Sequence, residues 1–411
     1  MDAFIFVLDV MFITIITIAL GLIIYYGINI IKYKPAKDQI NMKNYKYAIL
    51  IPARNESHVI RNLLESIVNQ EYKLDSKDIY IIIEDESDPT IEIVKEYNMS
   101  YYIRGDIEGK RRKGYALDEC IKDILSKGLK YDAFFIFDAD NVLDHKFIYY
   151  MNESFNNGYD IAIGYRNSTN WNYNSISVCS GLTFTMINNF GNIERLRKDY
   201  NVVISGTGYY IKGSIIEELG GFPFYSLTED YELSLFSILK KYKTTYNLDA
   251  EYFDEQPTTL KVSNKQRKRW VKGYFEARKK YSKKIIEESK NDKVNHKAKS
   301  FGVWPLFILI IQLLLYFVTH IVLGITAYYD GLDYFWYFLR VIGVIAFSYT
   351  ILVIFTLILI ILEQKRAKFK FKTIIKALMF NPIFLLMYVY IVLSSFGKEE
   401  VKWEEIQHCG R

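Results

Sequence analysis

The stretch Tyr45–Glu56, YKYAILIPARNE, decides the fold class of this chain. Its apolar run ends at Pro52 and is followed, after Ala53, by Arg54, Asn55 and Glu56. A continuous apolar run of this length is typical of a strand that is buried on both faces of a parallel sheet. We therefore expect an α/β domain with a binding edge where this strand ends.

The same pattern continues towards the C-terminus. Apolar runs and helical spacing predict strands over 78–83 and 133–137 and helices over 56–69, 90–97 and 115–127. This order is typical of a doubly wound sheet, in which ligands bind beyond the carboxyl ends of the strands. Polar clusters follow two further strands, at Glu84–Asp88 and Asp138–Asn141. The sequence contains neither a GxGxxG turn nor a Gly-rich lysine loop, which argues against a dinucleotide fold and a P-loop enzyme.

Apolar residues gather at both ends of the chain, which has 411 residues. A helix that spans a bilayer needs about 20 apolar residues, and four segments reach that length: Ala3–Ile31, Val303–Tyr328, Phe335–Leu362 and Ile374–Phe396. The first lacks the basic start and the cleavage site of a signal peptide, so we predict a membrane anchor. The last is interrupted by Asn381-Pro382, so it either crosses the bilayer or lies at its surface.

The charged residues give an orientation. Lysines follow the first apolar segment, the loop 363–372 is basic and the loop 330–333 is acidic. The positive-inside rule places the middle domain in the cytoplasm of a multi-pass cell-membrane protein. The net charge is only +5, and the basic runs adjoin apolar segments or a motif. We therefore expect a lipid bilayer and an anionic substrate as partners, and no nucleic acid.

The predicted domains follow from these segments. They are a transmembrane helix (1–34), a cytoplasmic α/β domain (41–262), amphipathic interface helices (263–300), a membrane region with two to three transmembrane helices (301–398) and a tail (399–411).

Two acidic motifs at strand ends suggest binding chemistry. Asp138 and Asp140, two residues apart after a buried strand, could hold a hard divalent cation that bridges a diphosphate. A solvated Asx turn is the alternative. In the cluster Glu84–Asp88, Asp85 or Glu84 could accept hydrogen bonds from a nucleoside, although such residues also cap helices.

Four later motifs each have two interpretations. Asp230, in Thr228-Glu229-Asp230, is a candidate general base, or this segment caps a helix. Gln266–Trp270, QRKRW, could bind phosphate and stack on a sugar, or it could form a helix that rests on the membrane. Lys113 could reach a phosphate or simply be exposed. The glycines at 206 and 208 could face an acceptor or form a hairpin turn.

Taken together, these motifs resemble a known family. AILIPARNE at 48–56, RKGYAL at 112–117, DAD at 138–140, TED at 228–230 and QRKRW at 266–270 occur in the order found in glycosyltransferase family 2. The chain resembles most its membrane-bound branch of cellulose, hyaluronan and poly-N-acetylglucosamine synthases. The resemblance covers roughly Tyr45 to Gly273. It implies a GT-A fold between transmembrane helices and inverting transfer from a nucleoside diphosphate sugar, usually a UDP-sugar, to a growing cell-surface polysaccharide.

The resemblance also implies roles for individual residues. Asp230 would be the catalytic base beside Glu229, and Asp138 and Asp140 would bind Mg²⁺ or Mn²⁺. The donor site would comprise Pro52, Arg54, Glu56, Glu84, Asp85, Lys113, Asp138 and Asp140, with Asp85 against the uridine. The acceptor and diphosphate would be held by Gly206, Thr207, Gln266, Arg269 and Trp270.

This sequence departs from the family pattern in two places. It has Glu84-Asp85 where many members have two aspartates. Either Glu84 or Asp85 could therefore be the residue that contacts the nucleobase. Its membrane part is also smaller than that of polymer-exporting synthases. Transfer of a single sugar to a membrane lipid is therefore the alternative function, and a homo-oligomer or accessory export subunits are open as further partners. A catalytically inactive membrane scaffold is the remaining hypothesis.

Overall fold

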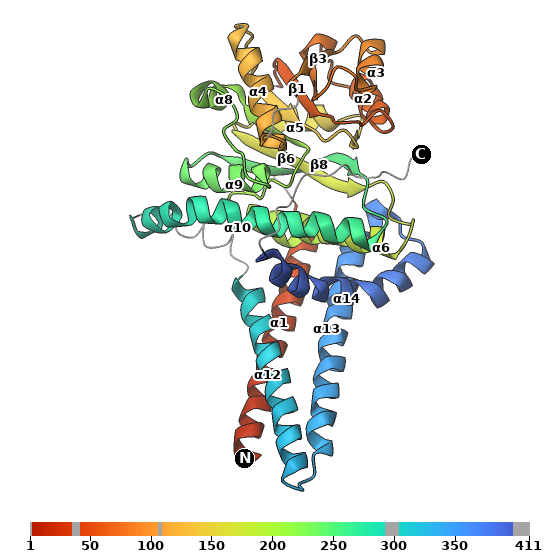
Figure 1. The fold of residues 1–411 in the computed structure, drawn as a ribbon. Helices are drawn as coiled ribbons and strands as arrows, with labels where there is room; N and C mark the ends of the chain where they lie inside the picture. Colours follow the sequence, from red (N-terminus) through yellow and green to blue (C-terminus); the bar gives the residue numbers. More distant parts are fainter. Residues whose placement is uncertain (1, 35–41, 106–108, 292–303, 398–411) are drawn as a thin grey trace.

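The computed structural model describes residues 2–34, 42–105, 109–291 and 304–397. The predicted tail (399–411) and part of the predicted interface region (292–300) lie outside these residues. The described residues form three tiers (Figure 1): an α/β domain, long helices that lie across its underside, and a bundle of roughly parallel helices.

The α/β domain is built on one mixed sheet with the strand order β3-β2-β1-β4-β7-β6-β8-β5. β1 is parallel to β2 and β4, and β7 runs antiparallel between β4 and β6. The strands are β1 (Tyr47–Pro52), β2 (Ile79–Ile83), β3 (Ser100–Ile103), β4 (Ala133–Ile136), β5 (Val142–Leu143), β6 (Ile161–Ser168), β7 (Tyr209–Lys212) and β8 (Thr244–Asp254). This sheet confirms the predicted α/β fold class.

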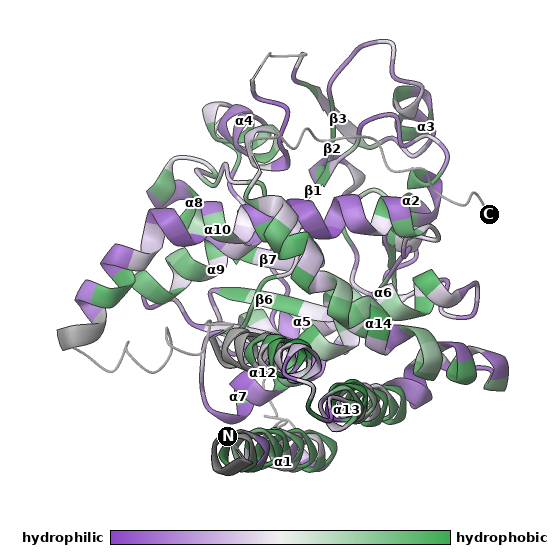
Figure 2. Ribbon diagram, turned by 60° about the horizontal axis from the view of Figure 1, so that its bottom comes forward, coloured by the Kyte–Doolittle hydropathy of each residue, from purple (hydrophilic) through white to green (hydrophobic). Residues whose placement is uncertain are grey.

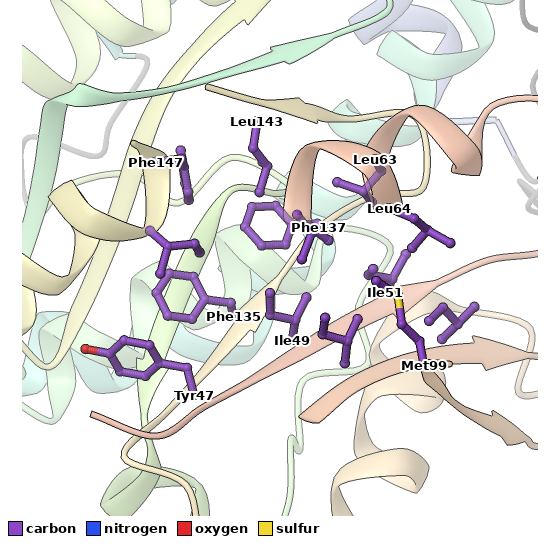
Figure 3. Packing of buried hydrophobic residues seen from close by; sticks show 14 of the residues in the cluster. Tyr47, Ile49, Ile51, Leu63, Leu64, Met99, Phe135, Phe137, Leu143 and Phe147 are labelled. Carbon is purple, nitrogen blue, oxygen red and sulfur yellow. The ribbon is translucent and has the colours of Figure 1, made fainter. Parts of the chain in front are cut away.

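Helices cover both faces of the sheet. Alternate residues of β1 and β4 point to opposite sides, so Ile49 and Phe135 join one apolar cluster and Leu50 and Phe134 another. Figure 3 shows the first cluster. It is covered by α2 (Ile60–Val68), α3 (Thr90–Glu96) and α5 (Phe147–Asn156). The second is covered by α4 (Lys113–Ser126), α8 (Gly213–Leu219) and α9 (Glu229–Leu239).

Two long helices lie beneath the sheet and nearly perpendicular to the bundle (Figure 1): α10 (Leu260–Asn291) and α14 (Phe371–Ser395). The helical segment formed by α6 (Ser175–Met186), the π-helix η2 (Ile187–Ile193) and α7 (Glu194–Arg197) lies on the same level. α14 is apolar enough to cross a membrane. Its sequence is compatible both with crossing the bilayer and with lying at the bilayer surface. In the structure it packs across α10, α6 and the end of α13.

The bundle consists of α1 (Asp2–Lys32), α12 (Trp304–Tyr329) and α13 (Phe335–Ala367). Where the ribbons of these helices are coloured in Figure 2, they are mainly green, so most of these residues are hydrophobic. In the described part of the chain, three helices are long and apolar enough to cross a membrane: Asp9–Lys32, Phe335–Ala367 and Phe371–Ser395. The start of α1 and the turn between α12 and α13 both lie at the end of the bundle remote from the sheet (Figure 1).

Charged side chains join the bundle to the sheet. On α13, Glu363 accepts a 2.6 Å hydrogen bond from Tyr165 of β6. Arg366 stacks on the Tyr165 ring at 3.9 Å and donates to the carbonyl of Leu248 on β8. These contacts fix the bundle against one edge of the α/β domain.

Candidate active site

Thirteen of the fifteen residues predicted for the site line one cavity of about 1340 Å³ beneath the carboxyl ends of β1, β2 and β4. Asp85 and Thr207 are the two outside its lining. The lining residues are Pro52, Arg54, Glu56, Glu84, Lys113, Asp138, Asp140, Gly206, Glu229, Asp230, Gln266, Arg269 and Trp270. Segments from positions 52 to 270 therefore converge on a single space.

The Asp138–Asp140 loop is fixed from behind. The amide of Asp138 donates to Oγ1 of Thr207 at 2.8 Å and to Oδ1 of Asn141 at 3.1 Å. Oγ1 of Thr207 donates in turn to Oδ1 of Asn141 at 2.5 Å. Thr207 and Asn141 are fully buried, so Thr207 supports the loop from below instead of lining the cavity. The loop is thus held more firmly than a solvated Asx turn.

Lys113 lies at the centre of the acidic groups. Its Nζ is 2.5 Å from Oδ1 of Asp138, 2.7 Å from the carbonyl oxygen of Gly206 and 3.7 Å from Oε1 of Glu229. Only 16% of its side chain is exposed. These carboxylates raise the pKa of Lys113 against the opposing effect of burial. The interpretation of Lys113 as an exposed lysine is therefore wrong.

Glu229 and Asp230 form the first turn of α9. Thr228 occupies the N-cap position of α9, but its side chain makes no capping hydrogen bond. Helix capping therefore does not explain the threonine at this position. Burial raises the pKa of both carboxyls, while Lys113 and Arg269 act in the opposite direction. Backbone hydrogen bonds at Tyr231 and Gly206 also favour the charged form of Asp230. The arrangement gives buried carboxylates with unusually high proton affinity.

Gly206 leaves a space between the two acidic motifs. Its φ of +82° is in the region that favours glycine. A Cβ at this position would lie 3.9 Å from Oδ2 of both Asp138 and Asp230, and 3.5 Å from Nη1 of Arg166. The turn leads into β7 from a segment without a paired strand, so it is not a hairpin turn. The two carboxylates thus face a common small volume.

The structure separates Glu84 from Asp85. Glu84 lines the cavity, and its carboxylate is 2.9 Å from Nε of Arg54 and 3.0 Å from Nη1 of the buried Arg104. Asp85 is exposed, and hydrogen bonds from the side chain and the amide of Ser87 lower its pKa. Asp88 caps the following helix by accepting from the amide of Thr90. The capping role predicted for this cluster therefore belongs to Asp88.

QRKRW lies within α10, between the sheet domain and α14. Arg269 donates to the carbonyl of Leu227, next to the acidic turn, at 3.2 Å. Trp270 packs edge-on against Phe184 at a centroid distance of 5.6 Å. Arg267 is 1% exposed and donates to the carbonyl of Phe384 on α14 at 2.9 Å. This part of α10 therefore packs on protein.

A sequence model of glycosyltransferase-like family 2 matches residues 44–273. The match covers more than half of the chain and includes all of the predicted site residues. The chain belongs to glycosyltransferase family 2. It is therefore an enzyme of the glycosyltransferase class.

The names of individual relatives are consistent with this family. The chain is 28% identical over 251 residues to the probable glycosyltransferase YdaM of Bacillus subtilis, covering 57% of this chain and 56% of that protein. It is 29% identical over 261 residues to the poly-beta-1,6-N-acetyl-D-glucosamine synthase of Staphylococcus epidermidis, covering 62% of this chain and 61% of the synthase. The match therefore spans less than two thirds of these curated relatives.

A solved structure shares the fold of this family 2 glycosyltransferase. The mannosyltransferase PcManGT from Pyrobaculum calidifontis, solved in complex with GDP-Man and Mn²⁺, superposes with a TM-score of 0.57 at 14% identity. The superposition covers 91% of this chain and 98% of that one. It confirms the predicted GT-A fold.

Two residues that line the cavity of this glycosyltransferase, Arg166 and Asp254, are not among those predicted from the sequence. Arg166 of β6 lies within 3.7 Å of the Phe184 ring, forms an ion pair with Asp254 of β8 and donates to the carbonyl of Ser205. Both Arg166 and Asp254 line the cavity. The available signal was a charged residue that follows the apolar run 161–165, the same pattern that marked Asp138.

The carboxylates in the cavity of the glycosyltransferase are suitable ligands for a hard divalent cation. Among the described residues, no group of three or more acidic, histidine or cysteine side chains has metal-binding geometry. Asp138 and Asp140 nevertheless supply carboxylate oxygens on the cavity wall. Mg²⁺ is often held by one or two carboxylates together with water and substrate phosphates. Such a cation would thus depend on the donor diphosphate for the rest of its ligands.

Proposed function

We propose that this family 2 glycosyltransferase transfers a sugar, with inversion, from a nucleoside diphosphate sugar to an acceptor hydroxyl at the cytoplasmic surface of a cell membrane. The convergence of both acidic motifs and QRKRW on one cavity carries this proposal. A UDP-sugar is the donor that the motifs favour. The basic loops and the remote position of the α12–α13 turn support a cytoplasmic catalytic domain.

Asp230 is the proposed catalytic base. Its carboxylate faces the space at Gly206, opposite Asp138 on the donor side. The acceptor oxygen attacks the anomeric carbon, its proton passes to Asp230, and the bond to the diphosphate breaks. The raised pKa of Asp230 favours proton uptake. One carboxylate of this kind serves a single direct displacement, which inverts the anomeric centre.

Cations stabilise the diphosphate as negative charge develops on it. Lys113 and Arg269 line the cavity beside the acidic motifs, where their charges are only partly screened by solvent. Asp138 and Asp140 would hold Mg²⁺ or Mn²⁺, which supplies Lewis-acid stabilisation of the diphosphate when bound. Trp270 offers an aromatic face for the acceptor sugar.

Two acceptor classes are supported by different observations. The poly-beta-1,6-N-acetyl-D-glucosamine synthases among the relatives favour a growing polysaccharide. The extension of the cavity between α1, α13 and α14 favours a membrane lipid. Both classes use the same base and the same donor site.

A donor screen tests the proposed function. Purified full-length protein in lipid vesicles is supplied with individual UDP- and GDP-sugars, with Mg²⁺, Mn²⁺ or EDTA, and release of the nucleoside diphosphate is measured. We expect release with at least one donor, loss with EDTA and loss in Asp140→Asn. Equal release from the wild type and Asp140→Asn would contradict the proposed donor site.

A further inference from the structure

The cavity does not end at the catalytic groups. From Asp230 it continues down between α1, η2, α13 and α14, where its lining becomes apolar. Representative lining residues of this lower part, called the chamber below, are Ile16 and Ile23 of α1, Phe190 of η2, Phe355 of α13 and Val389 of α14. The chamber thus connects the site of chemistry to the interior of the helix bundle.

The chamber has the depth of one leaflet. Its lining on α1 runs from Ile16 to Tyr26. Ten helical residues at about 1.5 Å each span about 15 Å, which is half of a hydrocarbon core of about 30 Å. A hydrocarbon chain that enters from the cytoplasmic side would match this depth.

Below the chamber the described helices pack together. Ile16 and Ile351 line its remote end and pack with Phe12, Tyr316 and Val344. The rings of Phe12 and Tyr316 are stacked at a centroid distance of 4.4 Å. A glycan that passed through the bundle would have to part this layer and leave its hydroxyls among aliphatic side chains, where unpaired polar groups are costly. The chamber therefore fits alkyl chains better than sugars.

Basic residues lie at the upper rim of the chamber. Arg195 and Lys198, at the end of the helical segment that includes η2, line the same cavity. Arg195 is 6% exposed, and burial lowers the pKa of its guanidinium to about 10. Nζ of Lys198 lies over the ring of Tyr26 on α1 at 4.9 Å, and it is 3.0 Å from Glu194. Arg195 is thus buried, whereas the Lys198 side chain is 39% exposed at the rim. Two cations next to an apolar slot suit the phosphate of a lipid headgroup.

We propose that the chamber binds the alkyl chains of an anionic phospholipid from the cytoplasmic leaflet, and that a hydroxyl in its headgroup is the sugar acceptor. Arg195 and Lys198 face the phosphate, and the hydroxyl beyond it reaches Asp230. The lipid oxygen forms a bond to the anomeric carbon, its proton goes to Asp230, and the nucleoside diphosphate leaves. This inference rests on the proposed function and names its acceptor class.

A matched pair of variants on α1 tests the chamber. Ile23 lines it, whereas Ile24 is 43% exposed on the outer surface of the helix. The probe is phosphatidylglycerol, which has both a phosphate and free hydroxyls, and lipid retention is measured by native mass spectrometry of the full-length protein. We expect Ile23→Trp to lower retention about tenfold, because the indole takes up space in the chamber and the alkyl chains would clash with it. Ile24→Trp should behave as the wild type.

The reaction itself is followed with a labelled donor sugar. Vesicles contain phosphatidylcholine with phosphatidylglycerol, with phosphatidic acid, or alone. We expect label in the organic extract only with phosphatidylglycerol, and we expect Ile23→Trp to lose it while still binding the donor. Label in a water-soluble polymer, or equal retention by Ile23→Trp and Ile24→Trp, would overturn the lipid acceptor and leave the glycosyltransferase intact. Absence of diphosphate release from the wild type with every donor would instead contradict the proposed function.

The headgroup contact has its own pair of variants. Lys198 lines the cavity, whereas the neighbouring Arg197 does not. We expect Lys198→Gln to weaken the preference for phosphatidylglycerol over phosphatidylcholine and Arg197→Gln to preserve it. An unchanged preference in both variants would remove Lys198 from the proposed headgroup site.

Discussion

One group of charged side chains in the described part of the molecule lies beneath the sheet, and another lies between helices of the bundle. Beneath the sheet, Lys113 lies between Asp138 and Glu229 on the wall of a large cavity. In the bundle, Asp9 is approached by the hydroxyl of Tyr316, by Nε2 of His320 at 3.6 Å and by Nε of Arg340 at 3.5 Å.

The difference lies in the balance of charge and in access. The upper group has more carboxylates than its central lysine can neutralise, and it faces open space. The lower group surrounds one carboxylate with potential donors from two other helices, directly beside the packed layer of Phe12 and Tyr316. The first arrangement suits chemistry on an added ligand, and the second suits the joining of helices.

The largest expected effect is that of Asp230→Asn. Loss of the general base should lower the transfer rate by about 10²- to 10⁴-fold, while donor binding measured by calorimetry stays close to that of the wild type. Glu218→Gln, on α8 away from the cavity lining, is the control. Near-normal transfer by Asp230→Asn would show that another group takes the proton.

Lys113→Met should cause the next largest loss of transfer. Its removal leaves Asp138 and Glu229 without the cation between them, so we expect a loss of transfer of about tenfold or more and a lower melting temperature. Lys113→Arg keeps the charge and should recover part of both. If Lys113→Met lowers only the melting temperature, the lysine has a structural role alone.

The pH dependence of transfer should reflect burial of the acidic turn. Asp230 acts as a base only when deprotonated, and burial raises its pKa. Activity should therefore fall on acidification at a pH above the ordinary range of about 4 for a carboxyl group. Because Lys113 lowers the pKa of Asp230, Lys113→Met should move this fall to still higher pH. The measurement is kcat/KM against pH, and a fall confined to the ordinary carboxyl range would count against a buried base.

Asp9→Asn should separate the two groups. We expect transfer within about twofold of the wild type, because Asp9 does not line the cavity and the packed layer of Phe12 and Tyr316 lies next to the cavity's remote end, but a lower melting temperature of the protein in detergent. Thr17→Ala, at an exposed position on the same helix, is the control. A large loss of transfer with an unchanged melting temperature would give the lower group a part in the reaction.

The smallest effects are expected at the residues predicted to contact the nucleoside of the sugar donor. Glu84 connects Arg54 to Arg104, so Glu84→Gln should raise the donor KM several-fold, about 1 kcal/mol in binding. The exposed Asp85 should tolerate Asp85→Asn with little change unless it contacts the nucleoside, as the resemblance implies. Donor KM values for the two variants decide between these residues.

Three of the eight described strands, β1, β2 and β4, could be predicted from the sequence because they are buried on both faces and therefore appear as unbroken apolar runs. The predictions do not include β5, β6, β7 or β8. β3 was not predicted. It lies at the edge of the sheet with half-buried side chains, and SYYI is too short and too polar to stand out. The apolar segments predicted the bundle, but hydropathy alone did not decide the position of α14.

The candidate site was predictable to the extent that motifs mark strand and helix ends. The side-chain contacts between these motifs could not be predicted, because they depend on how distant segments pack in the folded chain. The position of Lys113 between Asp138 and Glu229 and the Arg166–Asp254 ion pair both join residues that are far apart in sequence. The support of the Asp138 loop by Thr207 has the same origin.

The contacts between α13 and the sheet also restrict how the protein can be divided. Cutting the chain before α13 would remove the partner of the buried Tyr165 hydroxyl and the stacking cation above its ring. It would also remove Phe384, whose carbonyl satisfies the buried Arg267. Because unpaired buried polar groups are destabilising, an excised catalytic domain would be expected to expose these surfaces and aggregate. The two halves should thus melt in one cooperative transition.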